Sequence, residues 1–450
     1  MGKGRDCCGW NAWFEMAGID EDGRAIATRR GTVTAPHSMV MPSLADIQRA
    51  RELISDAVVR TPLVPALALR QRVPGPLFLK LENLQRTGSF KDRGALNRLL
   101  ALSAEERARG VVTASAGNHA QAVAYHGARL GIPVQVVMPE HTPLIKVTNT
   151  RRFGADVRFH GATLDESITE ARRLEREESR ILVHAFDDER VIAGQGTIGL
   201  ELLEQLDNIT AVVVPIGGGG LISGIAIALK EQRPSVKVFG VEAAAAPSAL
   251  ASRNAGHIVK LESADTLADG IAVKRVGERT FPLIERYVDD IVSVDEDEIA
   301  AAVHLLLEQE KVLAEGAGAV PLAALIAGKL PIRAEDVTVM VLSGGNIDVN
   351  MVERIIARGL VADGRLAMLA VTVPDRPGSL ARLTTLVAAG GANVLQLSHR
   401  RAFADISVRD VEIVMQLETR GPDHVKDIVR TLEQHGFGVR KNEHSMATVL

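Results

Sequence analysis

Apolar residues between positions 77 and 361 fall into short runs that alternate with helical patterns. The runs at 110–112, 134–137, 210–215, 237–241 and 337–342 are rich in β-branched residues, as strands buried on both faces of a parallel sheet are. Helical periodicity occupies 119–130, 144–153, 195–206, 222–232 and 296–309. This alternation of strands and helices predicts a doubly wound α/β architecture.

The pattern changes after residue 365. Strands are predicted at 366–373, 393–399, 411–417 and 438–440, with one helix capped by Ser379 and another starting at Pro422. The order βαββαβ predicts a small α+β unit of the ferredoxin-like type. Residues 362–365 are the predicted linker.

The first 40 residues show neither the apolar pattern of a helix nor that of a strand. Both tryptophans and both cysteines lie within the first 13 positions. The segment lacks the apolar core and the cleavage site of a signal peptide. We interpret residues 1–40 as a poorly ordered extension that precedes a helix capped by Ser43.

Composition narrows the class of protein. The chain has 450 residues, of which 46% are apolar and 24% charged, as in an average soluble globular protein. Its net charge of −4 argues against a nucleic-acid partner held by phosphate neutralisation. The sequence has no apolar run of 18 residues to span a membrane, and the adjacent Cys7 and Cys8 cannot staple a fold. These features favour a cytoplasmic protein stabilised by packing.

The first candidate for chemistry is Lys91, in the segment Thr87-Gly-Ser-Phe-Lys-Asp-Arg-Gly94. It follows a Gly-Ser turn at a predicted helix start, where the positive end of the helix dipole disfavours the ammonium form. A neutral lysine amine can form a Schiff base with an aldehyde. Spacing alone fits an ordinary surface lysine equally well.

Two predicted turns after strands suit anions. Ser115-Ala-Gly-Asn-His-Ala-Gln121 directs backbone N–H groups outward, and Asn118 could donate to a phenolate or carbonyl oxygen. The four glycines 217–220 separate a strand from a helix, so their backbone could wrap a phosphate. They match neither the dinucleotide fingerprint nor a P-loop. The alternatives are a tight turn capped by Asn118 and a flexible linker.

A fourth motif, Ser343-Gly-Gly-Asn346, follows the strand at 337–342. Open α/β sheets bind ligands at this end of their strands. An amine, an amide donor, a phosphate cup and a serine at the ends of elements in one sheet suit a single cofactor, pyridoxal phosphate. It needs partners for its aldehyde, ring oxygen, phosphate and ring nitrogen.

These motifs resemble those of the threonine ammonia-lyases (threonine dehydratases), which are pyridoxal-phosphate enzymes of fold type II, the tryptophan-synthase-β-like class. The resemblance covers about residues 41–440, and the tail is similar to a single ACT domain. It implies a two-domain catalytic region with parallel sheets at 41–361, a small subdomain at about 85–190 inserted in the larger one, and an α+β ACT regulatory domain at 366–450. The motifs that carry it are Ser89-Phe-Lys-Asp-Arg-Gly-Ala95, Thr113-Ala-Ser-Ala-Gly-Asn-His-Ala-Gln121, Val191-Ile-Ala-Gly-Gln-Gly-Thr197, Pro215-Ile-Gly-Gly-Gly-Gly-Leu221, Asp269-Gly-Ile-Ala-Val-Lys-Arg275 and Leu342-Ser-Gly-Gly-Asn346.

The resemblance also implies a role for each motif. Lys91 holds the cofactor covalently and, once freed by the substrate, serves as the base at Cα. Phe90 packs against the cofactor ring, Asn118 meets its ring oxygen and Ser343 its ring nitrogen. The phosphate is held by Gly217, Gly218, Gly219, Gly220 and Leu221, and the substrate carboxylate by Ser115, Ala116, Gly117 and His119.

The implied reaction converts L-threonine to 2-oxobutanoate and ammonia, with side activity on L-serine. A neutral serine at the ring nitrogen gives a weaker electron sink than an aspartate would, which favours elimination over transamination. The step would begin isoleucine, and hence branched-chain amino acid, biosynthesis or threonine catabolism. Two alternatives stay open: another β-elimination or β-replacement enzyme of the class, such as a serine dehydratase, threonine synthase or cysteine synthase, and a non-catalytic amino-acid sensor.

Two departures from the family bear on these alternatives. Relatives that racemise serine carry a serine where this chain has Ala116, so racemisation is disfavoured. Relatives that bind a divalent cation near Glu242 carry a second acid where this chain has Ser248. A hard cation needs several oxygen ligands, so we expect no metal site.

The resemblance to an ACT domain predicts regulation. Such domains pair across subunits, which implies a homodimer or homotetramer, and bind an amino-acid effector at the loop after their first strand. Here the implied allosteric residues are Asp375, Gly378 and Asn393, and the implied effectors are isoleucine or valine. The alternative is a domain that only assists oligomerisation.

Overall fold

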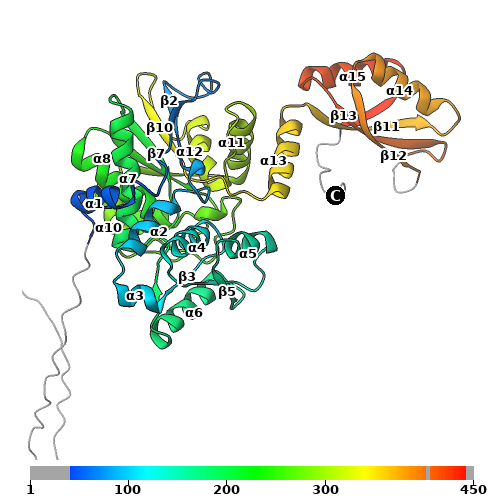
Figure 1. Cartoon of the computed structure of the whole chain (residues 1–450). Helices are drawn as coiled ribbons and strands as arrows, with labels where there is room; N and C mark the ends of the chain where they lie inside the picture. Colours follow the sequence, from blue (N-terminus) through cyan, green and yellow to red (C-terminus); the bar gives the residue numbers. More distant parts are fainter. Residues whose placement is uncertain (1–40, 402–405, 442–450) are drawn as a thin grey trace, which may run out of the picture. The chain divides into compact units, whose positions relative to one another are not determined.

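The computed structural model describes residues 41–401 and 406–441 (Figure 1). The extension predicted at 1–40 lies outside the described residues. Helix α1 (Leu44–Ile54) begins as predicted, because the Ser43 side chain accepts from Asp46 N in a capping box. Within the described ranges, the structure has no helix of the length and apolarity that crossing a membrane requires.

The larger sheet of the catalytic region has six strands in the order β1-β2-β10-β7-β8-β9 (Figure 1). Only β1 pairs antiparallel, and the strand order requires crossover helices. The strands are β1 (Leu63–Pro65), β2 (Leu77–Leu81), β7 (Ala211–Pro215), β8 (Lys237–Ala243), β9 (Asp290–Val294) and β10 (Thr338–Leu342). The predicted α/β architecture is therefore confirmed.

The smaller sheet is wholly parallel, in the order β5-β4-β3-β6. Its strands are β3 (Val111–Ala114), β4 (Val134–Met138), β5 (Asp156–Phe159) and β6 (Ile181–Leu182), and its helices are α4 (Asn118–Leu130), α5 (Leu144–Arg151) and α6 (Leu164–Glu177). Sequence patterning missed β5, because only Val157 of its four residues is buried, and β9, whose pattern is also interrupted by exposed or half-buried positions. It also missed the short β1 and β6, and β2, whose apolar run Lys80 interrupts.

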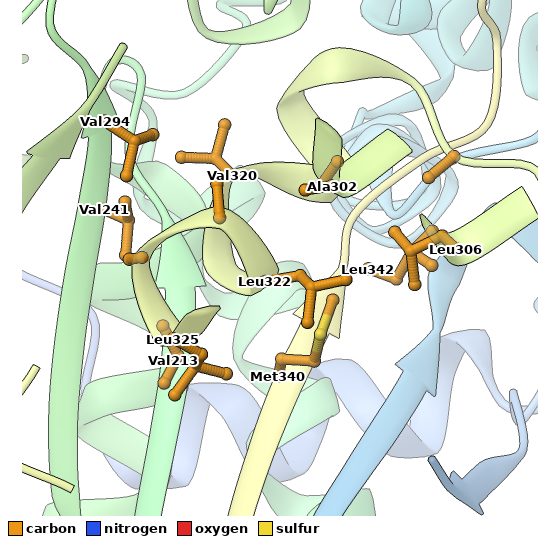
Figure 2. Close-up of a cluster of buried hydrophobic side chains, with 14 of the residues drawn as sticks. Val213, Val241, Val294, Ala302, Leu306, Val320, Leu322, Leu325, Met340 and Leu342 are labelled. Carbon is orange, nitrogen blue, oxygen red and sulfur yellow. The ribbon is translucent and has the colours of Figure 1, made fainter. Parts of the chain in front are cut away.

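The remaining helices pack around these two sheets. They are α2 (Lys91–Leu100), α3 (Ala104–Arg109), α7 (Glu189–Gln205), α8 (Gly220–Gln232), α9 (Ser248–Ala255), α10 (Thr280–Tyr287), α11 (Glu296–Glu308), α12 (Gly316–Ile326) and α13 (Val349–Ala362), with 3-10 turns η1 (Glu82–Leu84) and η2 (Asp269–Ile271). Helix α12 is buried on every side. Its Val320, Leu322 and Leu325 belong to one hydrophobic cluster with Val213, Val241 and Met340 of the sheet (Figure 2). A helix that is apolar all round has no amphipathic period, which is why patterning missed it.

A buried ionic cluster fixes the position of α2. Arg93 is 0% exposed, and its guanidinium donates to Glu82 at 2.8 Å and to Glu201 at 2.6 Å. Lys80 donates to the same Glu201 at 2.6 Å. Removing one member would leave an uncompensated buried charge, so the cluster ties α2 to β2, η1 and α7. Lys91 stands two residues before Arg93, at the start of α2.

The C-terminal unit is an antiparallel sheet in the order β12-β13-β11-β14 with two helices (Figure 1). Its elements are β11 (Leu366–Pro374), α14 (Ser379–Ala389), β12 (Asn393–Arg400), β13 (Asp410–Glu418), α15 (Pro422–Gln434) and β14 (Gly438–Lys441). The predicted βαββαβ order is confirmed. One detail was wrong: Ser379 is the first helical residue, and Gly378, with φ +93°, takes the N-cap position without a capping side chain.

Candidate active site

A cavity of about 360 Å³ lies at the carboxyl ends of β3, β7 and β10. Parallel sheets bind ligands at this end because strand ends and helix N-termini converge there. Every residue that the sequence assigned to catalysis, cofactor or substrate lines this one cavity: Phe90, Lys91, Ser115, Ala116, Gly117, Asn118, His119, Gly217, Gly218, Gly219, Gly220, Leu221 and Ser343. The structure thus brings the four motifs together, while their individual roles stay predictions.

Lys91 reaches the cavity from the first residue of α2. Its Nζ donates to the carbonyl of Ala185 at 2.8 Å and lies 5.0 Å from the centre of the Phe90 ring. Desolvation lowers the pKa of Lys91 from 10.5 to about 8, against the opposing charge of Glu315. A substantial fraction of this amine is therefore neutral near pH 8, as a nucleophile requires.

The four glycines Gly217–Gly220, here called the glycine cup, form a wall of the cavity from backbone alone. Gly219 has φ +92° and is the N-cap of α8, which begins at Gly220. A Cβ on Gly218 would lie 2.3 Å from the Phe186 ring, and one on Gly220 would lie 2.9 Å from the Phe186 carbonyl oxygen. Thr280 braces the cup by donating its Oγ1 hydrogen to the Gly218 carbonyl at 2.6 Å. The helix N-terminus and these bare glycines form a cradle that fits a phosphate.

The turn at residues 115–117, which the sequence predicts to bind the substrate carboxylate, leads into α4. Gly117 is the N-cap of α4, and Ser115 Oγ accepts from its backbone N–H at 3.2 Å. The His119 ring is buried, and its Nε2 lies 3.0 Å from the Val183 carbonyl, so Nε2 carries the hydrogen. Burial, and then the charge of Lys91, lower the pKa of His119 to about 3. His119 is therefore a neutral anchor, and it would serve an anionic substrate through its backbone N–H.

Sequence reasoning missed a buried acid in the cavity wall. Glu315, 3% exposed, accepts from Asn118 Nδ2 at 2.8 and 3.0 Å through its two carboxylate oxygens. Burial, and then the charge of Asp269, raise the pKa of Glu315 from 4.5 to about 7. Asn346 Nδ2 donates to Asn118 Oδ1 at 2.7 Å. No sequence signal marks Glu315, because it follows an irregular segment and precedes a helix without a period.

Two further buried polar residues, His126 and Glu242, do not line the cavity. His126 is fully buried, and its Nε2 lies 3.2 Å from Asp92. Glu242 accepts from the backbone N–H groups of Ala249 and Leu250, both at 2.8 Å, and burial raises the pKa of Glu242 to about 7. Its carboxylate therefore anchors the N-terminal turn of α9.

The allosteric residues implied by the sequence all lie in the C-terminal unit. Asp375, after β11, pairs with Arg401 at 2.9 Å, and Gly378 is the N-cap of α14. Asn393 begins the edge strand β12 and donates to Glu418 at 3.3 Å.

The residues present fit a pyridoxal phosphate. The cradle excludes any Cβ at Gly218, the Lys91 amine has a lowered pKa, and the Ser343 hydroxyl lies in the wall at 1% residue exposure. Fold and site together define the class as a pyridoxal-phosphate-dependent enzyme of fold type II. The profile of the family described as "Pyridoxal-phosphate dependent enzyme" matches residues 54–344.

Individual relatives narrow the class further. The L-threonine ammonia-lyase of Thermotoga maritima is 49% identical over 89% of this chain and 99% of its own length. The biosynthetic L-threonine dehydratase IlvA of Escherichia coli is 39% identical over 88% of this chain and 77% of its own length. The structure of threonine deaminase isoform 2 from Solanum lycopersicum matches with a TM-score of 0.66 and 39% identity, over 72% of this chain and 98% of that one. The chain therefore belongs to the threonine ammonia-lyase family of pyridoxal-phosphate-dependent carbon–nitrogen lyases.

Proposed function

We propose that the protein eliminates water from L-threonine to give an enamine, whose imine tautomer takes up water and hydrolyses to 2-oxobutanoate and ammonia, and that it acts on L-serine as a secondary substrate. The observation that carries the proposal is the convergence of Lys91, Asn118, the glycine cup and Ser343 on one cavity. Relatives named L-threonine ammonia-lyase support the same substrate, because the similarity spans 99% of the first relative's length.

Bound pyridoxal phosphate supplies an electron sink conjugated to the substrate Cα. The residues of the chain then have separate tasks. Lys91 would hold the cofactor through its aldehyde, and its amine would serve as the base for the substrate Cα proton. Asn118 donates to the ring oxygen, and backbone N–H groups of Gly217–Gly220 and Leu221 hold the phosphate. Ser343 would offer the ring nitrogen a neutral partner, and the weaker electron sink that results would favour loss of the β-hydroxyl over reprotonation of Cα.

Serine racemases are also among the similar structures, as in Dictyostelium discoideum at 38% identity and a TM-score of 0.65. Racemisation needs a second proton donor on the opposite face of the substrate. Ala116, at the cavity wall, has no titratable group to supply that proton. The geometry therefore favours elimination.

The direct test is 2-oxobutanoate formation from L-threonine by the purified holoenzyme. Loss of product in K91A, with binding of the cofactor phosphate retained, would support the proposal and rule out a sensor. Full activity in K91A would contradict the lysine assignment. Product release from O-acetylserine or O-phosphohomoserine instead of threonine would indicate a cysteine synthase or threonine synthase.

We further propose that the C-terminal unit is an ACT-like module that binds an amino acid such as isoleucine or valine near Asp375, Gly378 and Asn393. Its βαββαβ order supports this, as does the exposed edge strand β12, which offers unpaired backbone groups to a second copy. The same edge supports a homodimer or homotetramer. Isoleucine titration of activity tests the effector, with D375A and N393A as variants, and light scattering tests assembly.

The biological role follows from the reaction. Deamination of threonine would begin isoleucine biosynthesis or threonine catabolism, and relatives of both kinds are similar to this chain. We propose a cytoplasmic site of action, supported by the two adjacent cysteines and the near-neutral charge. Inhibition by isoleucine would indicate the biosynthetic role, and insensitivity would indicate catabolism.

A further inference from the structure

The amide of Asn118 lies between two polar side chains whose donors and acceptors can be assigned. The backbone carbonyl of Thr87 can only accept a hydrogen bond. Asn346 Nδ2 lies 2.7 Å from that oxygen, so this end of Asn346 is the donor. The same Nδ2 lies 2.7 Å from Asn118 Oδ1. The carbonyl end of Asn118 therefore faces Asn346.

The nitrogen end of Asn118 must then face Glu315. Its Nδ2 lies 2.8 and 3.0 Å from the two carboxylate oxygens. An ionised carboxylate only accepts, so it matches an N–H donor at this place. A rotated Asn118 amide would set its oxygen against the carboxylate and its NH₂ against that of Asn346. Both contacts would be repulsive, so the network permits one orientation.

The protein is shaped around this carboxyl group. A Cβ on Gly344 would lie 2.4 Å from Glu315 Oε1, and one on Gly270 would lie 3.2 Å from it. Glu315 is also held by its backbone N–H, which donates to the Gly344 carbonyl at 3.1 Å. Two bare glycines thus make room for an acid whose burial is unfavourable.

We propose that Glu315 is a positioning residue of the active site: with Asn346 on the other side, its carboxylate locks the amide of Asn118 so that N–H bonds, and not the carbonyl oxygen, face the ring oxygen of the cofactor. This rests on the proposed role of Asn118. Protonated Glu315 could donate as well as accept and would no longer specify the orientation, so the ionised form is the one that positions Asn118.

The charges around Glu315 set when it ionises. Asp269 on η2 opposes ionisation, Lys146 on α5 favours it, and Lys91 on α2 is the cation whose pKa Glu315 raises. With a pKa of about 7 in the fold and 4.5 as the ordinary value, folded protein binds more protons than unfolded protein between these limits. The ionised acid therefore costs stability above pH 7. We expect a residue kept at such a cost to act in the reaction.

The test compares E315Q with E242Q. Glu242 is an equally buried acid whose pKa is also about 7, and it does not line the cavity, so E242Q is the matched control. Three quantities are measured: the thermal midpoint of the apoenzyme from pH 5 to 9, the absorption band of the bound pyridoxal phosphate over the same range, and kcat and KM for threonine. The first is independent of cofactor and activity.

We expect apo E315Q to melt above wild type at pH 8 and to match it at pH 5. In the holoenzyme, a glutamine that can donate or accept leaves Asn118 less constrained. The cofactor band should shift, and kcat should fall about tenfold with a smaller change in KM. We expect wild type to lose activity below pH 7, where Glu315 is protonated, and this loss should disappear in E315Q. E242Q should keep the wild-type band and kinetics.

N346A gives an independent arm, because it frees the other end of Asn118 without removing a charge. It should shift the band as E315Q does and leave the pH dependence of apo stability at wild type. A wild-type band and wild-type kinetics in E315Q at every pH would overturn the proposal, and N346A decides it if E315Q does not fold. A wild-type enzyme that takes up cofactor but does not deaminate threonine would refute the proposed function while leaving the comparison of bands to decide the positioning role.

Discussion

The two walls of the cavity are made in opposite ways. The cup at α8 is backbone: four consecutive glycines at the N-terminus of a helix, whose surroundings exclude side chains. The wall at α12 is made of side chains, where Asn118, Asn346 and Glu315 meet from three distant parts of the chain. The first wall has no titratable group. The second has an acid with a pKa of about 7. A phosphate needs a fixed cradle, whereas control of a proton near Lys91 needs groups that respond to charge.

The largest expected effect is that of replacing Lys91. K91A should lower kcat for threonine by at least about a thousandfold, because the other lysine in the cavity wall, Lys146, is paired with Asp269 and does not replace the Lys91 amine. Product assays check the rate, and the absorption spectrum checks the loss of the covalent bond. A kcat in K91A above about one tenth of the wild-type value would show that the rest of the site catalyses the reaction without the lysine.

The backbone wall is tested by G218A. A Cβ here would lie 2.3 Å from the Phe186 ring, so the cup must open or the ring must move. We expect cofactor affinity to fall by about a hundredfold, which corresponds to roughly 3 kcal/mol, measured by fluorescence titration of the apoenzyme. G328A is the control, since Gly328 also precludes a relaxed alanine, with φ +64°, but a Cβ there meets nothing within 4 Å. Equal losses of affinity in both variants would refute the steric argument.

The two walls also differ in pH dependence, and cofactor uptake reports it. The pKa of Lys91 is lowered to about 8, so about half of the amine that attacks the aldehyde is neutral at that pH. The rate of uptake by the apoenzyme should rise by several-fold from pH 7 to 8 and level off above about pH 9. Since Glu315 raises the pKa of Lys91, E315Q should shift this curve to lower pH. An unshifted curve would show that the acid does not act on the lysine.

The two walls also differ in how much of each could be predicted from the sequence, because one is contiguous along the chain and the other is not. Gly217–Gly220 are contiguous and follow a buried strand, so their spacing already indicates a phosphate cradle. The contact of Asn118 with Glu315 joins residues 197 positions apart, and local pattern contains no such information. The sheets were predictable at β3, β4, β7, β8 and β10, where most residues of each strand are buried and apolar. They were not at β1 and β6, which are short, at β2, which Lys80 interrupts, or at β5 and β9, and α12 has no polar face to set a period.

The smallest expected effect concerns the support behind the α12 wall. The Thr87 carbonyl accepts from Asn346, and Thr87 in turn donates to Asp92 through its backbone N–H and its hydroxyl, both at 2.9 Å. Asp92 also lies 3.2 Å from His126 on α4. Both members of this Asp–His pair are fully buried, so D92N should cost about 1–3 kcal/mol of unfolding free energy, measured by urea titration.

Activity should respond less than stability in D92N. Asparagine keeps one acceptor for Thr87, so the Thr87 carbonyl and Asn346 should stay in place, and kcat should fall by no more than about threefold at saturating cofactor. H126A should lose at least as much stability as D92N, because it removes the same contact and also leaves a cavity in place of a fully buried ring. A tenfold fall of kcat in D92N with little loss of stability would show instead that the positioning network extends past Asn346 to the third turn of α4.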